Sequence, residues 1–350
     1  MLLFVGSYAG TSDSGVELFH FDEETVNFKK QAEYVGLKNP TFVNVNPSTS
    51  SLYAICDQVN EDGSRSGALA HFRYTSDSLQ LVSIKSTETG PTCHVQRDEQ
   101  AQYLIVTSYH GGMIGLIGLN EDGSLGEVLD VVQHVGTSVD PERQDRPHPH
   151  SSFFSNDGKY LYVQDLGIDK LLVYKLDTFA QKLIAAGEVK LPAGAGPRHL
   201  AFHPQKPVAY VINELNSTVS VFGYDATTGQ LESLQHISTL PEDFAGENGT
   251  AEIVVSQDGR FVYGSNRGHD SIVVFAVDEQ GTLSPVQHIS SGGGHPRHFT
   301  LTPSGRHLLV ANRDDNNIVV LARDEASGKL TATGKEAFST KPVCLIPIEQ

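Results

Sequence analysis

The sequence predicts an all-β protein, a seven-bladed β-propeller with four antiparallel strands in each blade and a ring closed by its two ends. Three observations lead to this prediction. The opening of a strand recurs at intervals of 46 to 58 residues, close to the period of propeller blades. The second strand of six units ends at a constant offset from that opening. The chain also starts with a second strand and finishes with a first strand.

Each unit opens at an anchor residue, which is proline in all units except one. The anchors are Pro40, Pro91, Pro149, Pro197, Thr250, Pro296 and Pro342. Sixteen residues after the anchor the second strand ends, at Cys56, Thr107, Asp165, Asn213, Asn266 and Asn312. Runs such as Ala-Tyr-Val-Ile have the β-branched and aromatic content of strands. The constant offset therefore indicates one repeated meander.

Turn signals order the strands within a unit. Asn-Asp-Gly at 156–158, Gln-Asp-Gly at 257–259 and Pro-Ser-Gly at 303–305 predict hairpins between the first and second strands. Third strands are expected at 171–174, 219–222, 272–275 and 318–321, and polar turns near 227 and 326 lead to a fourth. The first two units are less regular, since Ser48-Thr-Ser-Ser replaces a glycine turn.

The two ends of the chain complement each other. Residues 342–348 look like a first strand with nothing after it, and residues 2–7 look like a second strand with no first. Pairing them would remove two exposed sheet edges and close the ring. We therefore expect a single domain over residues 1–350.

Composition excludes several classes of partner. The chain has 25 Lys and Arg against 42 Asp and Glu, a formal net charge of −17, which argues against a nucleic-acid surface. The apolar run at residues 1–5 is too short for a signal peptide or a membrane span, so we expect no membrane partner and a cytoplasmic location.

Cys56, Cys93 and Cys344 are too few and too dispersed for a disulfide framework. Oligomeric state is not encoded in any pattern found.

Two positions of the repeat are expected at one mouth of the central channel. The start of a first strand and the end of a second strand lie at the same end of an antiparallel blade. The position after the anchor holds Thr41, Thr92, His150, Arg198, Ala251, Arg297 and Val343. The position seventeen after it holds Asp57, Ser108, Leu166, Glu214, Arg267 and Arg313. Several cations around one carboxylate would hold a small anion.

Structural interpretations of these residues stay open beside the functional ones. The arginines and Glu214 could instead form rim salt bridges between blades. Asn266 and Asn312 could be substrate ligands or recurrent turn formers. His148 and His150 could bind substrate or transfer protons, could simply be packed, or could form half of a metal site completed by His94, His199 and His298. Strand alternation places His199 and His298 away from Arg198 and Arg297, so no metal is assigned.

The sequence resembles the seven-bladed propeller lactonase family, which includes bacterial 6-phosphogluconolactonases and fungal carboxy-muconate cyclases. The resemblance spans nearly the full length and rests on Arg-Pro-His-Pro-His-Ser at 146–151, Val-Gln-Asp-Leu-Gly-Ile-Asp at 163–169, Gly-Pro-Arg-His-Leu-Ala-Phe-His-Pro at 196–204, Tyr-Val-Ile-Asn-Glu-Leu at 210–215 and Gly-Ser-Asn-Arg-Gly-His-Asp-Ser-Ile at 264–272. It implies a site made of His150, Arg198, Glu214 and Arg267.

The same resemblance implies hydrolysis of a small sugar lactone, foremost 6-phosphogluconolactone, without a cofactor. Glu214 is then expected as general base, Arg198 and Arg267 as oxyanion stabilisers, and His150 as proton donor to the ring oxygen. His148, Arg297, Arg313, Asn266 and Asn312 are expected to bind substrate, with Arg297 and Arg313 on the phosphate. A cycloisomerase or lactonase acting on another small carboxylic acid, and a non-catalytic propeller that binds a partner, remain alternatives.

Overall fold

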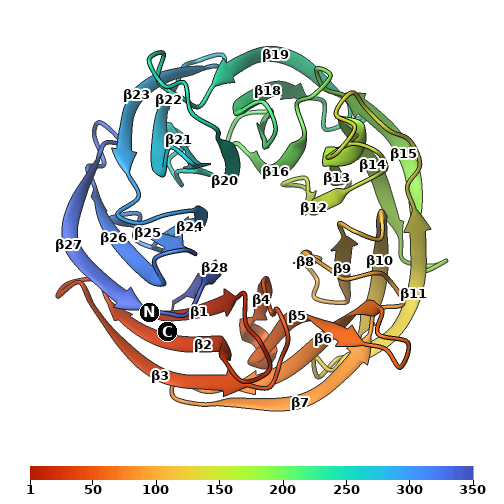
Figure 1. Cartoon of the computed structure of the whole chain (residues 1–350). Helices are drawn as coiled ribbons and strands as arrows, with labels where there is room; N and C mark the ends of the chain where they lie inside the picture. Colours follow the sequence, from red (N-terminus) through yellow and green to blue (C-terminus); the bar gives the residue numbers. More distant parts are fainter. Residues whose placement is uncertain (350) are drawn as a thin grey trace.

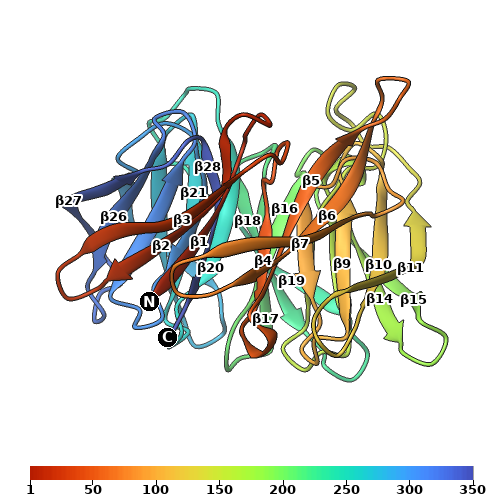
Figure 2. The same cartoon turned by 90° about the horizontal axis from the view of Figure 1, so that it is seen from below.

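Seven four-stranded antiparallel sheets form a ring around a central channel in the computed structural model, which describes residues 1–349 (Figure 1). Each sheet is one blade. Blade 1 has the strand order β28-β1-β2-β3, and blades 2 to 7 follow in chain order from β4–β7 to β24–β27. Seen from the side, the blades stand next to one another and the two chain ends lie close together (Figure 2). The predicted fold class is confirmed.

The strands of the seven blades fall into four positions, counted outward from the channel. The innermost strands are β28 (Pro342–Ile348), β4 (Val43–Asn46), β8 (His94–Arg97), β12 (Pro149–Phe154), β16 (Pro197–Phe202), β20 (Gly249–Val255) and β24 (Pro296–Leu301). The second strands are β1 (Leu2–Ser7), β5 (Ser51–Val59), β9 (Tyr103–Ser108), β13 (Leu161–Asp165), β17 (Val208–Asn213), β21 (Phe261–Arg267) and β25 (His307–Asn312). The third strands are β2 (Ser14–Asp22), β6 (Arg65–Tyr74), β10 (Met113–Leu119), β14 (Lys170–Asp177), β18 (Thr218–Tyr224), β22 (Ser271–Val277) and β26 (Asn317–Arg323). The outermost strands are β3 (Asn27–Val35), β7 (Leu79–Ser86), β11 (Leu125–Gln133), β15 (Lys182–Lys190), β19 (Leu231–Ser238), β23 (Leu283–Ser290) and β27 (Leu330–Phe338).

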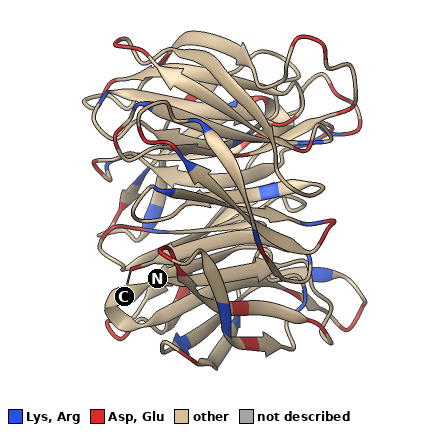
Figure 3. Cartoon of the chain, turned by 90° about the vertical axis from the view of Figure 1, so that its left-hand side faces the viewer, with Lys and Arg blue, Asp and Glu red and all other residues tan. Residues whose placement is uncertain are grey.

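Helix is limited, within residues 1–349, to two short 3-10 turns, η1 (Pro47–Thr49) and η2 (Leu166–Ile168). The turn η1 occupies the place where the sequence lacks a glycine turn, and Ser50 ends it with a left-handed backbone (φ 51°). Neither helix is long and apolar enough to cross a membrane. Charged residues on the side shown in Figure 3 lie mostly in the turns, while the strands are largely uncharged.

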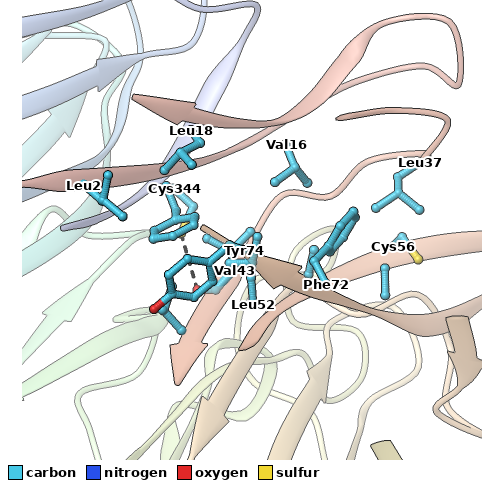
Figure 4. Close-up of a cluster of buried hydrophobic side chains, with 14 of the residues drawn as sticks. Leu2, Val16, Leu18, Leu37, Val43, Leu52, Cys56, Phe72, Tyr74 and Cys344 are labelled. Carbon is cyan, nitrogen blue, oxygen red and sulfur yellow. Dashed lines mark hydrogen bonds between the residues drawn. The ribbon is translucent and has the colours of Figure 1, made fainter. Parts of the chain in front are cut away.

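The two ends of the chain close the ring as predicted. β28 pairs antiparallel with β1, with Leu2 opposite Ile348 and Gly6 opposite Cys344. The closed blade then packs on blade 2 through a cluster of buried side chains that Figure 4 shows facing one another. Within it the rings of Phe4 and Tyr74 meet edge to face, with centroids 4.7 Å apart. The closing strand is therefore part of the hydrophobic core.

A repeated tyrosine bond links neighbouring blades. Four buried tyrosines on second strands donate a hydrogen bond to a glycine carbonyl in the following blade, over 2.6 to 3.0 Å. The pairs are Tyr53 with Gly123, Tyr162 with Gly229, Tyr210 with Gly281, and Tyr263 with Gly328. These glycines have positive φ, and at all four of them an added Cβ would meet a side chain at 2.6 Å or less. Each glycine backbone therefore lies too close to the preceding blade to admit a Cβ, and the tyrosine bond links the two blades at this contact.

A β-bulge recurs at the channel end of the innermost strands. In β16, Pro197 pairs with Asn213 and His199 pairs with Ile212, so Arg198 is an extra residue without a partner across the strand. The same shift occurs at His150 in β12 and at Arg297 in β24. A bulge redirects side chains and interrupts strict alternation. Bulges therefore occur at His150, Arg198 and Arg297, three of the residues that the sequence predicted at the mouth.

Candidate active site

A cavity of about 320 Å³ opens at one mouth of the channel. It is bounded by the connections after β5 and β9, by the starts of β12 and β24, and by the segment that precedes β12. Its lining includes Tyr8, Asp57, Tyr109, Arg143, His150, Glu214 and Arg297. The volume lies at the lower end of the range for small-molecule sites. Residues from both predicted mouth positions of the repeat meet here.

Three arginines surround the carboxylate of Glu214, which directly follows β17. Arg143 Nη2 lies 2.7 Å from Oε1, while Arg267 Nη2 and Arg198 Nε lie 2.9 and 3.2 Å from Oε2. Burial by itself would raise the pKa of the Glu214 carboxyl. The three guanidinium groups outweigh that effect and hold the pKa well below its usual range. Glu214 is therefore a firmly ionised carboxylate.

Backbone carbonyls of β20 fix two of these arginines. Arg198 Nη1 donates to the carbonyl of Ala251 at 2.6 Å, and Arg267 Nη2 donates to that of Thr250 at 2.6 Å. Burial, followed by the nearby charges of Arg297 and Arg267, lowers the pKa of Arg198 to about 9. Arg198 is therefore a buried cation with two further arginine charges close by.

Arg297 adds a cation that no described carboxylate neutralises. Its side chain lines the main cavity and a smaller one beneath it, with the guanidinium 5.4 Å from the centre of the Tyr8 ring. No carboxylate within residues 1–349 lies within ion-pairing distance of it. Four arginines thus meet one carboxylate, which leaves positive charge available for an anion or a developing oxyanion.

His150 supplies an uncharged imidazole next to these cations. Its Nδ1 is buried without a hydrogen-bond partner, which leaves Nε2 as the nitrogen on the cavity side. Burial, and then the charges of Arg198 and its neighbours, keep the pKa of His150 well below its ordinary value. The ring is therefore neutral near pH 7 and able to accept a proton.

The predicted orientation of His199 and His298 is wrong. Both line the small lower cavity together with Arg198 and Arg297, because the bulge breaks the alternation on which the prediction rested. His199 Nδ1 lies 3.0 Å from one oxygen of Glu252, and His298 Nε2 lies 3.2 Å from the other. A buried histidine and glutamate layer therefore fills the channel below the site.

The structure does not bring four of the expected substrate-binding residues to the cavity wall. His148 stacks on the Tyr109 ring and bonds through Nδ1 to the Tyr109 carbonyl at 2.8 Å. Arg313 pairs with Asp314 at 2.6 Å in a neighbouring hollow. Asn266 and Asn312 are fully buried, and their amides bond to the carbonyls of Thr239 and Ser291. The two asparagine side chains therefore make structural hydrogen bonds within the fold, which agrees with the structural interpretation left open above.

Arg143 and Tyr109 are site residues that sequence reasoning missed. Arg143 lies in the segment between β11 and β12, and its Nη2 also donates to the Tyr109 hydroxyl at 3.2 Å. One sequence signal could have found it. The spacing between Pro91 and Pro149 is the longest of the repeat, and the additional residues include Arg143. An insertion in a repeat is a candidate binding element.

The family model described as "Lactonase, 7-bladed beta-propeller" matches residues 2–347. The chain belongs to this lactonase family. A 6-phosphogluconolactonase of Bacillus subtilis (strain 168) is 36% identical over 345 residues, covering 98% of this chain and 97% of the relative. A 6-phosphogluconolactonase of Formosa agariphila is 31% identical over 343 residues, covering 95% and 96%. The resemblance inferred from the sequence motifs is confirmed.

Two solved structures agree with the lactonase assignment and with the fold. A putative 6-phosphogluconolactonase from Bacteroides fragilis has a TM-score of 0.91 at 30% identity, covering 99% of this chain and 98% of its own. The periplasmic gluconolactonase of Pseudomonas aeruginosa also has a TM-score of 0.91, at 32% identity with 99% of both chains covered. These relatives include a protein described as periplasmic, so the expected cytoplasmic location of this lactonase stays a prediction.

Proposed function

We propose that this lactonase hydrolyses a small sugar lactone, foremost 6-phosphogluconolactone to 6-phosphogluconate. The observation that carries the proposal is the group of three arginines bound to Glu214, with Arg297, which pairs with no carboxylate among residues 1–349, and the neutral ring of His150 in the wall of the same cavity as Glu214. Lactone hydrolysis needs a proton acceptor for the attacking water and positive charge at the carbonyl oxygen. His150 lines the main cavity with Arg143 and Arg297, and it also lines the smaller cavity that contains Arg198, so both are available at one mouth of the channel. The named relatives support the substrate.

The first step is attack of water on the lactone carbonyl carbon. His150 Nε2 takes the water proton as the new C–O bond forms, and the carbonyl oxygen becomes an oxyanion. Arg198 is placed to stabilise it, since its Nη2 donates to no residue among 1–349. In the second step the ring C–O bond breaks and His150 returns its proton to the leaving oxygen. Because the pKa of His150 is low, its protonated form is a ready donor.

Glu214 takes a different role from the general base expected above. Both carboxylate oxygens of Glu214 are already in contact with the guanidinium groups of Arg143, Arg198 and Arg267, which leaves them less free to take a proton than the Nε2 of His150. We propose that Glu214 aligns the arginines and accepts a hydrogen bond from the attacking water. Arg267 is then proposed to hold Glu214 in place and to add positive charge near the oxyanion.

Arg297 is the residue we propose for the phosphate, because its charge has no described carboxylate partner. Arg313 is bound to Asp314 in the neighbouring hollow, so we propose no phosphate contact for it. Hydrolysis in this site requires no cofactor. Since the cation surplus would also hold a carboxylate, a lactonase or cycloisomerase for another small acid is the second candidate function.

The test is to follow hydrolysis of freshly generated 6-phosphogluconolactone with and without the protein, corrected for spontaneous opening. We expect rapid turnover by the wild type and a loss of about 10²-fold or more in kcat for His150→Asn, the range of a positioned acid or base. His236→Asn is the control, because His236 lies on the outermost strand β19 away from the cavity. A wild-type rate equal to the spontaneous rate would overturn the proposed substrate.

A further inference from the structure

The wall of the cavity on blade 2 has a different chemistry from the arginine cluster. Asp57 lies in β5, and its side chain is 6% exposed. Its Oδ2 accepts hydrogen bonds from Asn39 Nδ2 at 2.9 Å and from Arg65 Nη1 at 3.0 Å. All three residues line the same cavity as His150 and Glu214. Neither the mechanism nor the charge argument above uses them.

These three side chains leave hydrogen-bonding capacity unused. Both donors to Asp57 use Oδ2, and no residue among 1–349 donates to Oδ1. The guanidinium of Arg65 donates through Nη1 alone. A carboxylate acceptor beside amide and guanidinium donors is the combination that a sugar hydroxyl needs, because a hydroxyl both donates and accepts.

The charge of this wall also distinguishes it from the arginine cluster. Arg65 neutralises Asp57 within one ion pair, so the Asp57, Asn39 and Arg65 group is uncharged as a whole. In a ring of seven blades, blade 2 lies across the channel from blades 5 and 6, which supply Arg198, Glu214 and Arg267. Glu214 lines the far side of the cavity with Arg198 and Arg267 bound to its carboxylate, so this cationic cluster faces a neutral polar wall.

The backbone holds this wall in a fixed position. Asn39 has a left-handed conformation (φ 52°), its N–H donates to the carbonyl of Ala9 at 2.8 Å, and its carbonyl accepts from Thr41 N–H at 2.7 Å. The Asp57 N–H donates to the carbonyl of Lys38 at 2.9 Å. A group already fixed in place binds with less loss of conformational entropy.

We propose that Asp57, Asn39 and Arg65 form a subsite for the hydroxyl groups of the substrate, so that this lactonase selects polyhydroxylated lactones over lactones of polycarboxylic acids. The inference rests on the proposed lactone hydrolysis. The anionic group and the carbonyl of the substrate lie toward the arginines, and its hydroxyls lie toward blade 2. A second carboxylate on this side would meet Asp57 and lose favourable interactions.

Equilibrium binding to Asp57→Asn tests the subsite separately from catalysis. The probes are 6-phosphogluconate, which carries hydroxyls, and inorganic phosphate, which does not. We expect the Kd of 6-phosphogluconate to rise about tenfold or more in the variant, because a polar site that loses its partner discriminates strongly. The Kd of phosphate should not rise, because the variant removes a negative charge and leaves the charge of Arg65 without its partner. An equal change for both probes, no change for either, or no binding of 6-phosphogluconate by the wild type would overturn the proposal.

Two further variants keep the test independent of folding defects. Asn39→Gly removes the amide while retaining a residue suited to the left-handed backbone, and it should weaken 6-phosphogluconate binding in the same selective way. Asp314→Asn is the matched control, since it removes a carboxylate paired with arginine in the neighbouring hollow. It should leave both Kd values unchanged. A wild type that binds 6-phosphogluconate but opens no lactone would contradict the proposed function and leave the hydroxyl subsite in place.

Discussion

Arg143 Nη2 lies 2.7 Å from Glu214 Oε1, although the two residues are 71 positions apart in the chain. Arg143 belongs to the segment between blades 3 and 4, and Glu214 to the end of the second strand of blade 5. The side chain of Arg143 is 43% exposed, while that of Glu214 is 9% exposed. This ion pair therefore ties a surface segment to an enclosed carboxylate at the cavity mouth.

Arg143→Ala should lower lactonase activity by about tenfold or more while changing the free energy of unfolding by less than about 1 kcal/mol. The small stability effect is expected because a half-exposed ion pair contributes little. Arg143→Lys should recover part of the activity. Arg146→Ala is the control, since Arg146 lies in the same segment with a 60% exposed side chain. Steady-state kinetics and urea unfolding provide both measurements, and unchanged kcat/KM would remove Arg143 from the site.

Glu214→Gln should reduce both stability and activity. Removing the carboxylate leaves the buried guanidinium groups of Arg198 and Arg267 without their counter-charge, and we expect a loss of about 3 kcal/mol in the free energy of unfolding. Activity should fall about 10²-fold or more when measured where the variant is still folded. Chemical denaturation and kinetics on one preparation separate the two effects. Full stability in the variant would show that the arginines do not depend on Glu214.

Stability should fall as the pH drops below about 6.5. Burial keeps the pKa of His94, His150 and His199 well below the ordinary value, and lowers that of His298 to about 4. The unfolded chain therefore binds more protons than the folded chain below pH 6.5, so folding stability is complete above that pH and decreases on acidification. The contribution of His298 to this loss of stability stops growing below about pH 4.

Glu252 acts in the opposite sense, because burial raises its pKa and the folded state then holds the extra proton. Because four histidines outweigh one glutamate, acidification should lower the free energy of unfolding by at most several kcal/mol per pH unit. Guanidinium unfolding at pH 7.5, 6 and 5 measures the slope. His298→Gln should reduce this slope by the equivalent of about one proton. Equal stability at all three pH values would contradict the expectation.

Removal of the last ten residues should lower the thermal unfolding midpoint far more than removal of a loose tail. The truncation deletes β28, which pairs with β1 and contributes Cys344 and Leu345 to two hydrophobic clusters. It would also expose the edge of β1. A chain that ends at Ile348 retains β28 and is the control. Differential scanning calorimetry provides the comparison, and matching midpoints would refute closure by the terminal strand.

Tyr210→Phe should lower the free energy of unfolding by about 1 to 2 kcal/mol. The variant leaves the carbonyl of Gly281 without its buried partner, which lies 3.0 Å from the Tyr210 hydroxyl. Tyr34→Phe is the control, because no residue among 1–349 hydrogen-bonds to the Tyr34 hydroxyl. The midpoints of urea unfolding of the two variants measure the difference in stability. Equal effects at the two tyrosines would mean that the inter-blade bond contributes nothing specific.

Much of the fold follows from the sequence alone. Strand content, turns and the spacing of the anchors are local features, and each was visible in a stretch of a few residues. The complementary ends predicted the pairing of β28 with β1. The repeat also predicted that His150, Arg198, Glu214 and Arg297 would gather at one mouth, because equivalent positions of equivalent blades must lie on one rim. The period of the sequence therefore determined the architecture and the neighbourhood of the site.

The tertiary structure alone decided which of these residues interact. Arg143 reaches Glu214 only because the ring brings an inserted segment over another blade, and no local pattern encodes that distance. A single extra residue at Arg198 turned His199 toward the channel, against the alternation of an ideal strand. Arg313 occupies an equivalent position to Glu214, yet Asp314 beside it captures its charge. Periodicity fixes where a backbone runs, whereas bulges, insertions and competing partners determine where each side chain binds.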